Sequence, residues 1–174
     1  SMCATEGGYV LVGDKASAQT TTDAWITKVD ASGNTIWSRT IGGKESDSPA
    51  YVTTTPDGGI LVCGFTFSAG GGQRDFWLTK LSSIGKVLFS VTAGDEAFQE
   101  AYTVIPAEDK YVLFGWTDPQ GRPDLIGMRL YDFWVVKLGV STQQVMSCFD
   151  FIWVAAILVI AIVIVAVVVA VIKL

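Results

Sequence analysis

Residues 58–81 read GGILVCGFTFSAGGGQRDFWLTKL, which is two short apolar runs separated by a glycine-rich connection. Each run is rich in β-branched or aromatic residues and is bounded by Gly, Ser or Asp, the pattern of a β-strand between turns. The preceding segment, residues 56–59, contains an Asp-Gly pair, and these residues tolerate the positive φ of a tight hairpin. We therefore predict two strands here, with a hairpin that joins the first of them to the strand before it.

Both runs recur along the chain in the same order. The first run matches residues 7–13 and 109–115, with a spacing of 51 residues each time. The second matches residues 23–29 and 132–138, at spacings of 52 and 57 residues. Two further strand patterns recur once each: residues 33–40 return as 85–92, and residues 50–54 return as 101–105. The chain is thus repetitive, with about four short strands in each period.

The repeat length and strand number together predict an architecture. A four-stranded antiparallel unit of about 50 residues cannot bury both of its faces alone, so copies must pack face to face. Packing around an axis gives a β-propeller, in which each period is one blade. We predict an all-β fold of antiparallel four-stranded repeat blades over residues 1–139.

A family resemblance follows from these motifs. The pattern DGG(Y/I)xVxG, then DxWxxK, then GxxxW resembles the β-propeller repeat of a family of predicted bacterial and archaeal surface proteins, and it covers nearly all of residues 7–138. The resemblance implies propeller architecture and surface display rather than one particular activity. The third copy departs from the pattern, because Asp109-Lys110 replaces the glycine pair and residues 118–131 are longer.

The predicted strands number about ten, which makes a partial β-propeller of about 2.5 blades. Propellers typically have roughly four to eight blades. Either additional blades lie upstream in a longer protein, or the chain completes its ring by self-association. We favour the additional blades.

The C-terminal part predicts a membrane anchor. Residues 151–172 are a run of 22 residues without a charge, which as a helix would span roughly 33 Å, against about 30 Å for a bilayer core. A lone strand in lipid would leave its backbone groups unpaired, so we predict one transmembrane α-helix at 151–172, after a juxtamembrane linker at 140–150. Aromatic residues at its start and Lys173 at its end favour a single-pass protein with the soluble domain outside the cytoplasm. A tail-anchored cytosolic interaction protein is the competing topology.

Composition excludes several classes of function. Before the tail there are 17 acidic and 11 basic residues, a net charge of about −6, and no Lys/Arg cluster that could neutralise a run of phosphates, so we expect no nucleic-acid partner. Histidine is absent, which removes the usual acid/base group and the commonest metal ligand. Cys3, Cys63 and Cys148 lack the spacing of a zinc site or a disulfide framework, and we predict a buried thiol at Cys63. We predict no catalytic residue, no metal and no cofactor.

Two recurring side chains are candidates for contacts. A tryptophan occupies the same repeat position three times, at Trp25, Trp77 and Trp134. We interpret these residues as contacts between blades, with a carbohydrate platform as the alternative. A lysine follows three residues later each time, at Lys28, Lys80 and Lys137. On a regular strand it points away from the tryptophan face, and we interpret it as a solvated charge at the blade edge.

A loop in the third repeat is the one predicted contact site. It interrupts the repeat between the two strand patterns and carries both charge signs, and binding functions are often placed on loops. Its candidate residues are Asp118, Gln120, Arg122 and Asp124.

These observations lead to a functional hypothesis. We expect a membrane-anchored, non-catalytic cell-surface repeat module for adhesion, recognition or scaffolding, with a protein or carbohydrate ligand. The alternatives are the C-terminal fragment of a larger propeller enzyme, quinoprotein-like or a hydrolase, and the tail-anchored cytosolic protein.

Overall fold

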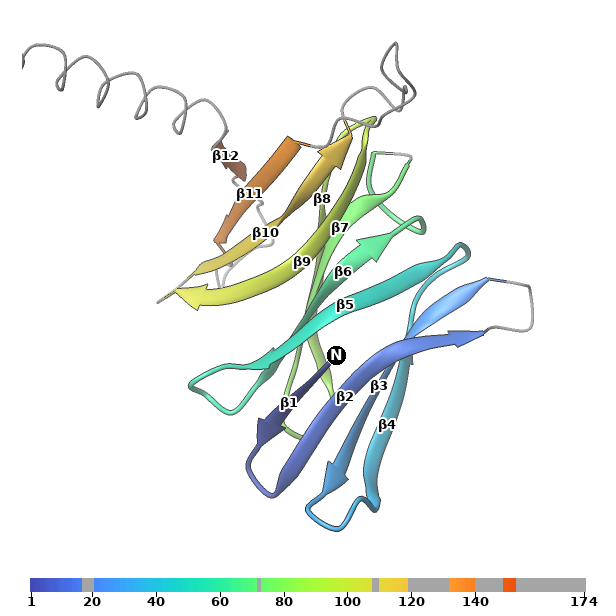
Figure 1. Ribbon diagram of the computed structural model, residues 1–174, viewed down its shortest axis with the longest axis vertical. Helices are drawn as coiled ribbons and strands as arrows, with labels where there is room; N and C mark the ends of the chain where they lie inside the picture. The colour runs from blue at the N-terminus through green and yellow to red at the C-terminus, as the bar shows by residue number, and fades with distance from the viewer. Residues whose placement is uncertain (17–20, 72, 108–109, 119–131, 140–148, 153–174) are drawn as a thin grey trace, which may run out of the picture.

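The computed structural model describes residues 1–16, 21–71, 73–107, 110–118, 132–139 and 149–152, with side chains through residue 139. Within these ranges, twelve strands form three four-stranded antiparallel sheets, each made of consecutive strands (Figure 1). The predicted all-β, antiparallel, four-stranded organisation is therefore confirmed.

The three sheets follow one another along the chain. Sheet A contains β1 (Met2–Thr5), β2 (Gly8–Ala16), β3 (Thr22–Asp30) and β4 (Thr35–Ile41). Sheet B contains β5 (Asp47–Thr54), β6 (Ile60–Thr66), β7 (Asp75–Leu81) and β8 (Val87–Ala93). Sheet C contains β9 (Phe98–Ala107), β10 (Lys110–Asp118), β11 (Asp132–Gly139) and β12 (Phe149–Ile152).

The strand count differs from the prediction of about ten strands and 2.5 blades. The two additional strands are β1, which pairs with β2, and β12, which pairs with β11. Both are only four residues long, and each is held by hydrogen bonds to the strand beside it rather than by a long apolar pattern of its own. The described residues therefore form three complete four-stranded units.

The hairpin predicted at residues 56–59 joins β5 to β6. Gly58 has φ of 75°, in the left-handed region that glycine enters without steric cost. The turn is closed by the Gly58 N–H, which donates to the Thr55 carbonyl at 2.9 Å, and by the Thr55 N–H, which donates to the Gly59 carbonyl at 2.9 Å. The Asp-Gly pair thus has the role that the sequence predicts.

Sheet B lies between the other two sheets and is apolar on both faces. The side of β6 that carries Ile60 and Val62 packs with β2 and β3 of sheet A. The side that carries Leu61 and Cys63 packs with β9, β10 and β11 of sheet C. Successive residues of β6 therefore enter different hydrophobic clusters, as the alternation of side chains along a strand requires.

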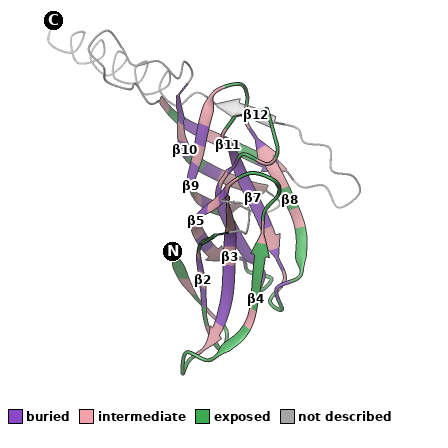
Figure 2. Cartoon of the chain, turned by 90° about the vertical axis from the view of Figure 1, so that its right-hand side faces the viewer, coloured by how far each residue is buried: buried purple, intermediate pink, exposed green. Residues whose placement is uncertain are grey.

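Each of the two outer sheets contributes one face to the hydrophobic core that the structure describes. In sheet A the apolar residues of β2 and β3 that enter the core alternate with residues that are less buried, except for Thr27, which is also buried. Figure 2 shows β3 largely buried and the edge strand β4 largely exposed. The hydrophobic core is thus two layers, one at the interface of sheets A and B and one at the interface of sheets B and C.

Cys63 is in the second of these layers, as predicted for a buried thiol. Its side chain is fully buried, and this burial raises the pKa of the thiol to about 12. The raised pKa keeps Cys63 in its unreactive thiol form at neutral pH. Cys148 lies outside the described residues.

The C-terminal strand changes the predicted segment boundaries. Phe149 and Asp150, which we expected in the linker, and Phe151 and Ile152, which we expected in the membrane helix, together form β12. This strand pairs with residues 135–138 of β11. The remaining residues of the predicted helix, 153–172, lie outside the described residues. Within the described ranges, the structure has no helix with the length and hydrophobicity that a membrane crossing requires.

A glycine next to a β-bulge gives a test of the sheet geometry. Gly64 pairs with Pro49 beside the extra residue Ala50, and a Cβ at Gly64 would overlap the Ser48 carbonyl oxygen. We expect Gly64→Ala to lower the free energy of unfolding by about 1–3 kcal/mol or more, because backbone must move. Gly13, at the equivalent place in sheet A, has nothing within 4 Å of such a Cβ. Gly13→Ala should change stability by less than about 0.5 kcal/mol in the same denaturation experiment, and equal effects of the two variants would contradict this account.

Candidate functional site

Sheets A and B carry the same internal contacts at equivalent positions. In sheet A the Trp25 indole N–H donates to Ser38 Oγ at 2.6 Å, and in sheet B the Trp77 indole N–H donates to Ser90 Oγ at 2.8 Å. Thr27 Oγ1 donates to the Trp37 carbonyl at 3.0 Å, and its counterpart Thr79 donates to the Phe89 carbonyl, also at 3.0 Å. The sequence repeat therefore corresponds to a repeat of side-chain interactions.

The tryptophans of sheets B and C lie on the face that meets the preceding sheet. Trp77 is buried in the cluster shared with sheet A, and Trp134 is buried in the cluster shared with sheet B. The ring of Phe76 in sheet B lies 4.9 Å from the ring of Trp134, between centroids, at an angle of 59°. The prediction that these tryptophans form contacts between repeats is confirmed for Trp77 and Trp134.

The opposite face meets the following sheet in sheets A and B, whereas no described sheet follows sheet C. The residue before the tryptophan is on this face: Ala24 and Phe76 are fully buried. Its counterpart in sheet C, Phe133, is 60% exposed, and it stacks on Phe114 with 5.5 Å between ring centroids. We define the outer face of sheet C by the directly paired residues of β10 and β11 on this side: Val112, Phe114, Trp116, Phe133, Val135 and Lys137.

A hollow lies at one end of this outer face. It has a volume of about 380 Å³, and its walls include Tyr102, Trp116, Phe133 and Asp132. Tyr102 is the extra residue of the bulge in β9 opposite Gly115, which explains why its ring is exposed. Exposed aromatic rings around a concave surface are typical of a surface that binds another molecule.

The predicted contact loop begins at this end of β10. Asp118 is the last residue of the strand, and its side chain is buried, with 2% exposed. Gln120, Arg122 and Asp124 lie outside the described residues, so the loop stays a prediction. The exposed aromatic residues beside it had no distinct sequence signal, because Phe114 and Phe133 occur within ordinary strand patterns.

A second hollow, of about 320 Å³, lies where the ends of sheets A and B meet. Its buried carboxylate, Asp47, is held by several donors. Thr66 Oγ1 donates to Asp47 Oδ1, and Oδ2 accepts from Ser68 Oγ and from the Gly43 N–H, each at 2.7 Å. These bonds connect the β4–β5 connection to the end of β6. The carboxylate therefore serves to fix the loop, and sequence reasoning missed it because it depends on pairing between distant strands.

The equivalent position at the interface of sheets B and C holds a different polar pair. Asp75 and Gln99 are both fully buried. Within the described residues, Asp75 Oδ1 and Gln99 Oε1 have no hydrogen-bond partner, and a Cβ at Gly94 would contact both side chains. Burial raises the pKa of Asp75 to about 6, the Gly71 N–H lowers it and the nearby Asp95 charge raises it.

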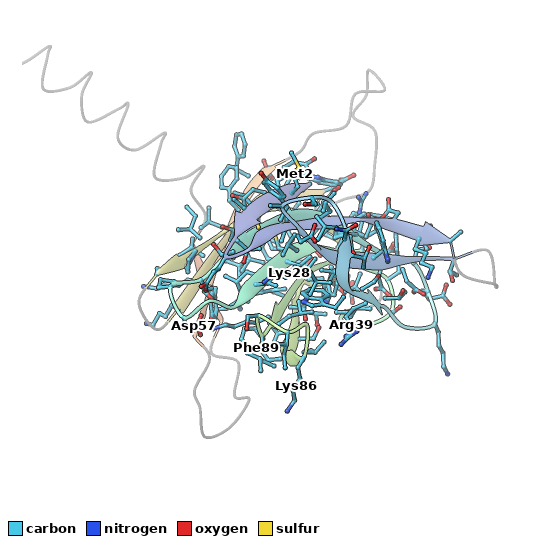
Figure 3. All side chains as sticks on the ribbon, turned by 90° about the horizontal axis from the view of Figure 1, so that it is seen from below. Met2, Lys28, Arg39, Asp57, Lys86 and Phe89 are labelled. Atoms are coloured by element: carbon cyan, nitrogen blue, oxygen red, sulfur yellow. The ribbon has the colours of Figure 1, made fainter. Side chains whose placement is uncertain are left out.

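The recurring lysines lie in three different environments, which corrects their interpretation as solvated charges. Lys28 is only 9% exposed and lies within the body of the protein, whereas Lys86 projects from a hairpin (Figure 3). Lys80 donates to Asp57 Oδ2 at 2.7 Å, and its Nζ lies 5.9 Å from the centroid of the Tyr111 ring in sheet C. Lys137 alone is exposed as predicted. The lysine position therefore belongs to the interface with the following sheet where such a sheet is present.

Comparison with known proteins adds no identification. No protein-family model matches the chain, and no curated protein matches it. Among the residues that the structure describes, no three His, Cys, Asp or Glu side chains gather as a metal site requires.

The raised pKa of Asp75 predicts a pH dependence of stability. Its unfolded-state pKa is about 4, so the folded state binds more protons than the unfolded state between about pH 4 and 6. Stability from this group is therefore greatest below about pH 4 and is lost as the pH rises to about 6. We expect the free energy of unfolding of the wild type, relative to Asp75→Asn, to fall by about 1–3 kcal/mol across this window. A difference that is constant from pH 4 to 7 in urea titrations would be incompatible with the assignment.

Asp57 provides the opposite control. The hydrogen bonds from Lys80 and Thr55 lower the pKa of Asp57 to about 2. The stabilisation by Asp57 is therefore present above about pH 4 and is lost as the pH falls towards 2. The wild type should lose stability relative to Asp57→Asn on acidification, in the reverse direction to Asp75→Asn.

Proposed function

We propose that this chain is a membrane-anchored, non-catalytic module of the β-propeller type that recognises another protein through the outer face of sheet C. The observation that carries the proposal is the exposure of Phe114 and Phe133 on a sheet face whose equivalents in sheets A and B are each covered by a neighbouring sheet. Adhesion, recognition and scaffolding all require such a surface and no reacting group.

A protein partner fits the shape and chemistry of this face. Val112 and Val135 extend the aromatic pair along two strands, so the apolar area is broad, and Lys137 supplies a charge at its edge. Broad apolar patches with aromatic residues and a polar rim are typical of protein interfaces. A carbohydrate would use the smaller hollow around Tyr102 and Trp116 instead, and binding there is an alternative outcome of the experiment below.

The propeller assignment is supported by the arrangement of the sheets. Each sheet is a meander of four consecutive strands, and neighbouring sheets pack face to face through the tryptophan side of one and the opposite side of the other. Blades of a propeller pack in this way around an axis. The resemblance of the repeat motifs to those of surface-protein propellers supports the same assignment.

The membrane anchor is proposed for residues 153–172, which follow β12 directly. These 20 residues are uncharged, and as a helix they would extend roughly 30 Å, the thickness of a bilayer core. The remaining apolar run is thus long enough to span a bilayer core, even though the first two residues of the original run belong to β12. Sheet C would then lie next to the bilayer without a linker, on its extracytoplasmic side.

Photo-crosslinking in cells that produce the full chain tests the recognition surface. We expect p-benzoylphenylalanine in place of Phe133 to give a discrete covalent adduct with another polypeptide on irradiation, because the ring would lie in the contact. The same group in place of Ile84, which is 72% exposed on the β7–β8 turn, is the matched control and should give no such adduct. Equal labelling at both positions, adducts with sugar polymers only, or turnover of a substrate by the purified chain would each count against the proposal.

Protease treatment of intact cells tests the anchor and its orientation. We expect external protease to remove the β-sheet domain while a fragment containing residues 153–172 stays with the membrane. Protection of the domain in intact cells, with cleavage only after lysis, would instead favour the cytosolic tail-anchored topology. Recovery of the untreated chain in the soluble fraction would exclude the anchor.

A further inference from the structure

Two carboxylates meet beside a glycine at the junction of sheets A and B. A Cβ added at Gly42 would overlap Asp23 Oδ1 and lie 3.0 Å from Asp47 Oδ2. Asp23 Oδ1 is buried and has no hydrogen-bond donor within the described residues. Gly42 and Asp47 also line the hollow of about 320 Å³ at this junction. Two negative charges are thus close together, next to space that can admit a small ion and water.

The junction of sheets B and C repeats this arrangement 52 residues further along the chain. A Cβ added at Gly94, the counterpart of Gly42, would overlap Asp75 Oδ1 and lie 2.8 Å from Gln99 Oε1. Both side chains are fully buried, and neither of these oxygens has a donor among the described residues. Two buried acceptors from neighbouring sheets therefore face the same place.

The two junctions carry the same number of carboxylates although one residue differs. Gln99 is the counterpart of Asp47, whereas Asp95 is the counterpart of Gly43. The Asp95 charge acts on Asp75, and Asp95 Oδ1 accepts from Gln99 Nε2, so the amide oxygen is the end that faces Asp75. A flip of the amide would only move the contact between two oxygens to Asp95. Neither orientation satisfies both carboxylates.

Carboxylates in such positions require a compensating positive charge. Within the part of the chain that the structure describes, no lysine or arginine forms a salt bridge with Asp23, Asp47 or Asp75. Buried charges are normally paired or coordinate a metal, because an unpaired buried charge is costly. We infer that each junction binds one divalent cation of the calcium type, held by Asp23 and Asp47 in the first site and by Asp75 and Gln99 in the second. Both sites lie apart from the outer face of sheet C.

The chemistry of the donors selects the kind of cation. Carboxylate and amide oxygens suit calcium, magnesium and manganese rather than softer metals. Calcium accepts about six to eight oxygens at about 2.3–2.6 Å in irregular geometry, whereas magnesium requires a near-octahedral set. The described residues bring no three His, Cys, Asp or Glu side chains together, so amide, hydroxyl and water oxygens would complete the coordination. The ligands meet only when neighbouring sheets pack, which is why no metal is predicted from the sequence.

Calcium binding by the purified full chain in detergent tests the two sites. After removal of metals with EDTA and exchange into metal-free buffer near neutral pH, equilibrium dialysis at about 1 mM free calcium should count two ions per chain, since extracellular calcium modules bind in this range. Asp23→Asn and Asp75→Asn should each weaken one site at least about tenfold, because ligand charge sets calcium affinity. Each single variant should therefore bind one ion and the double variant none. Asp30→Asn, which removes a carboxylate at the opposite end of β3, is the matched control and should bind two.

Thermal unfolding provides a readout that does not depend on counting ions. In EDTA at neutral pH, Asp75→Asn should melt no lower than the wild type, because its amide can donate to Gln99 Oε1. Calcium should raise the Tm of the wild type and of Asp30→Asn by at least about 4 °C, since the ion binds only the folded state. It should raise the Tm of the double variant of Asp23 and Asp75 by less than about 1 °C. Asp75 titrates as described above in EDTA, because a bound cation competes with the proton.

Three outcomes would overturn the inference. These are no bound calcium up to about 10 mM, which is above the range of extracellular modules, two ions bound by the double variant, and equal stabilisation of the wild type and the double variant by calcium. The first outcome would leave a proton as the group that compensates Asp75. Loss of an ion in only one of the two single variants would reject the site at the other junction. Circular dichroism of each variant in EDTA verifies that the sheets are intact.

Discussion

Sheet B has apolar side chains on both faces, and the remainder of the structure depends on this constraint. Ile60 and Val62 alternate with Leu61 and Cys63 along β6, so neither face can be left in water without a large loss of hydrophobic free energy. In this fold each face is covered by a neighbouring sheet. Sheets A and C are those covers, and each is half-buried because it has only one such neighbour within the described residues.

Buried polar side chains also lie at the ends of the sheets, where neighbouring sheets meet. Asp47 accepts hydrogen bonds from Thr66, Ser68 and Gly43, and it connects the first strand of sheet B to the segment that leaves sheet A. At the next interface, Asp75 and Gln99 occupy the comparable region with fewer donors around them. The two interfaces are thus alike in apolar packing but differ in electrostatics. The interface of sheets B and C is therefore the one whose stability responds to pH near 6.

Much of the fold was predictable because it depends on local chemistry. The strand patterns around the tryptophans and the Asp57-Gly58 turn identify most strands, since alternation and positive φ are properties of short segments. β1 and β12 were not predictable in this way, because Met2–Thr5 and Phe149–Ile152 become strands only by pairing with a neighbour. The candidate site was even less predictable from the sequence than these two strands. Lys28 and Lys137 occupy the same repeat position, and they differ in burial because, within the described residues, a following sheet packs on sheet A but not on sheet C.

The consecutive order of strands in each sheet has a consequence for how the protein is made. Because every strand pairs with its neighbours in the sequence, most contacts within a sheet are local, and local contacts form early and fast. Sheet A can form as soon as residue 41 has left the ribosome, but it gains its cover only when sheet B follows. Sheet C is completed last, since β12 comes from residues 149–152. Its final strand is therefore added only when the adjoining apolar segment, residues 153–172, is being synthesised.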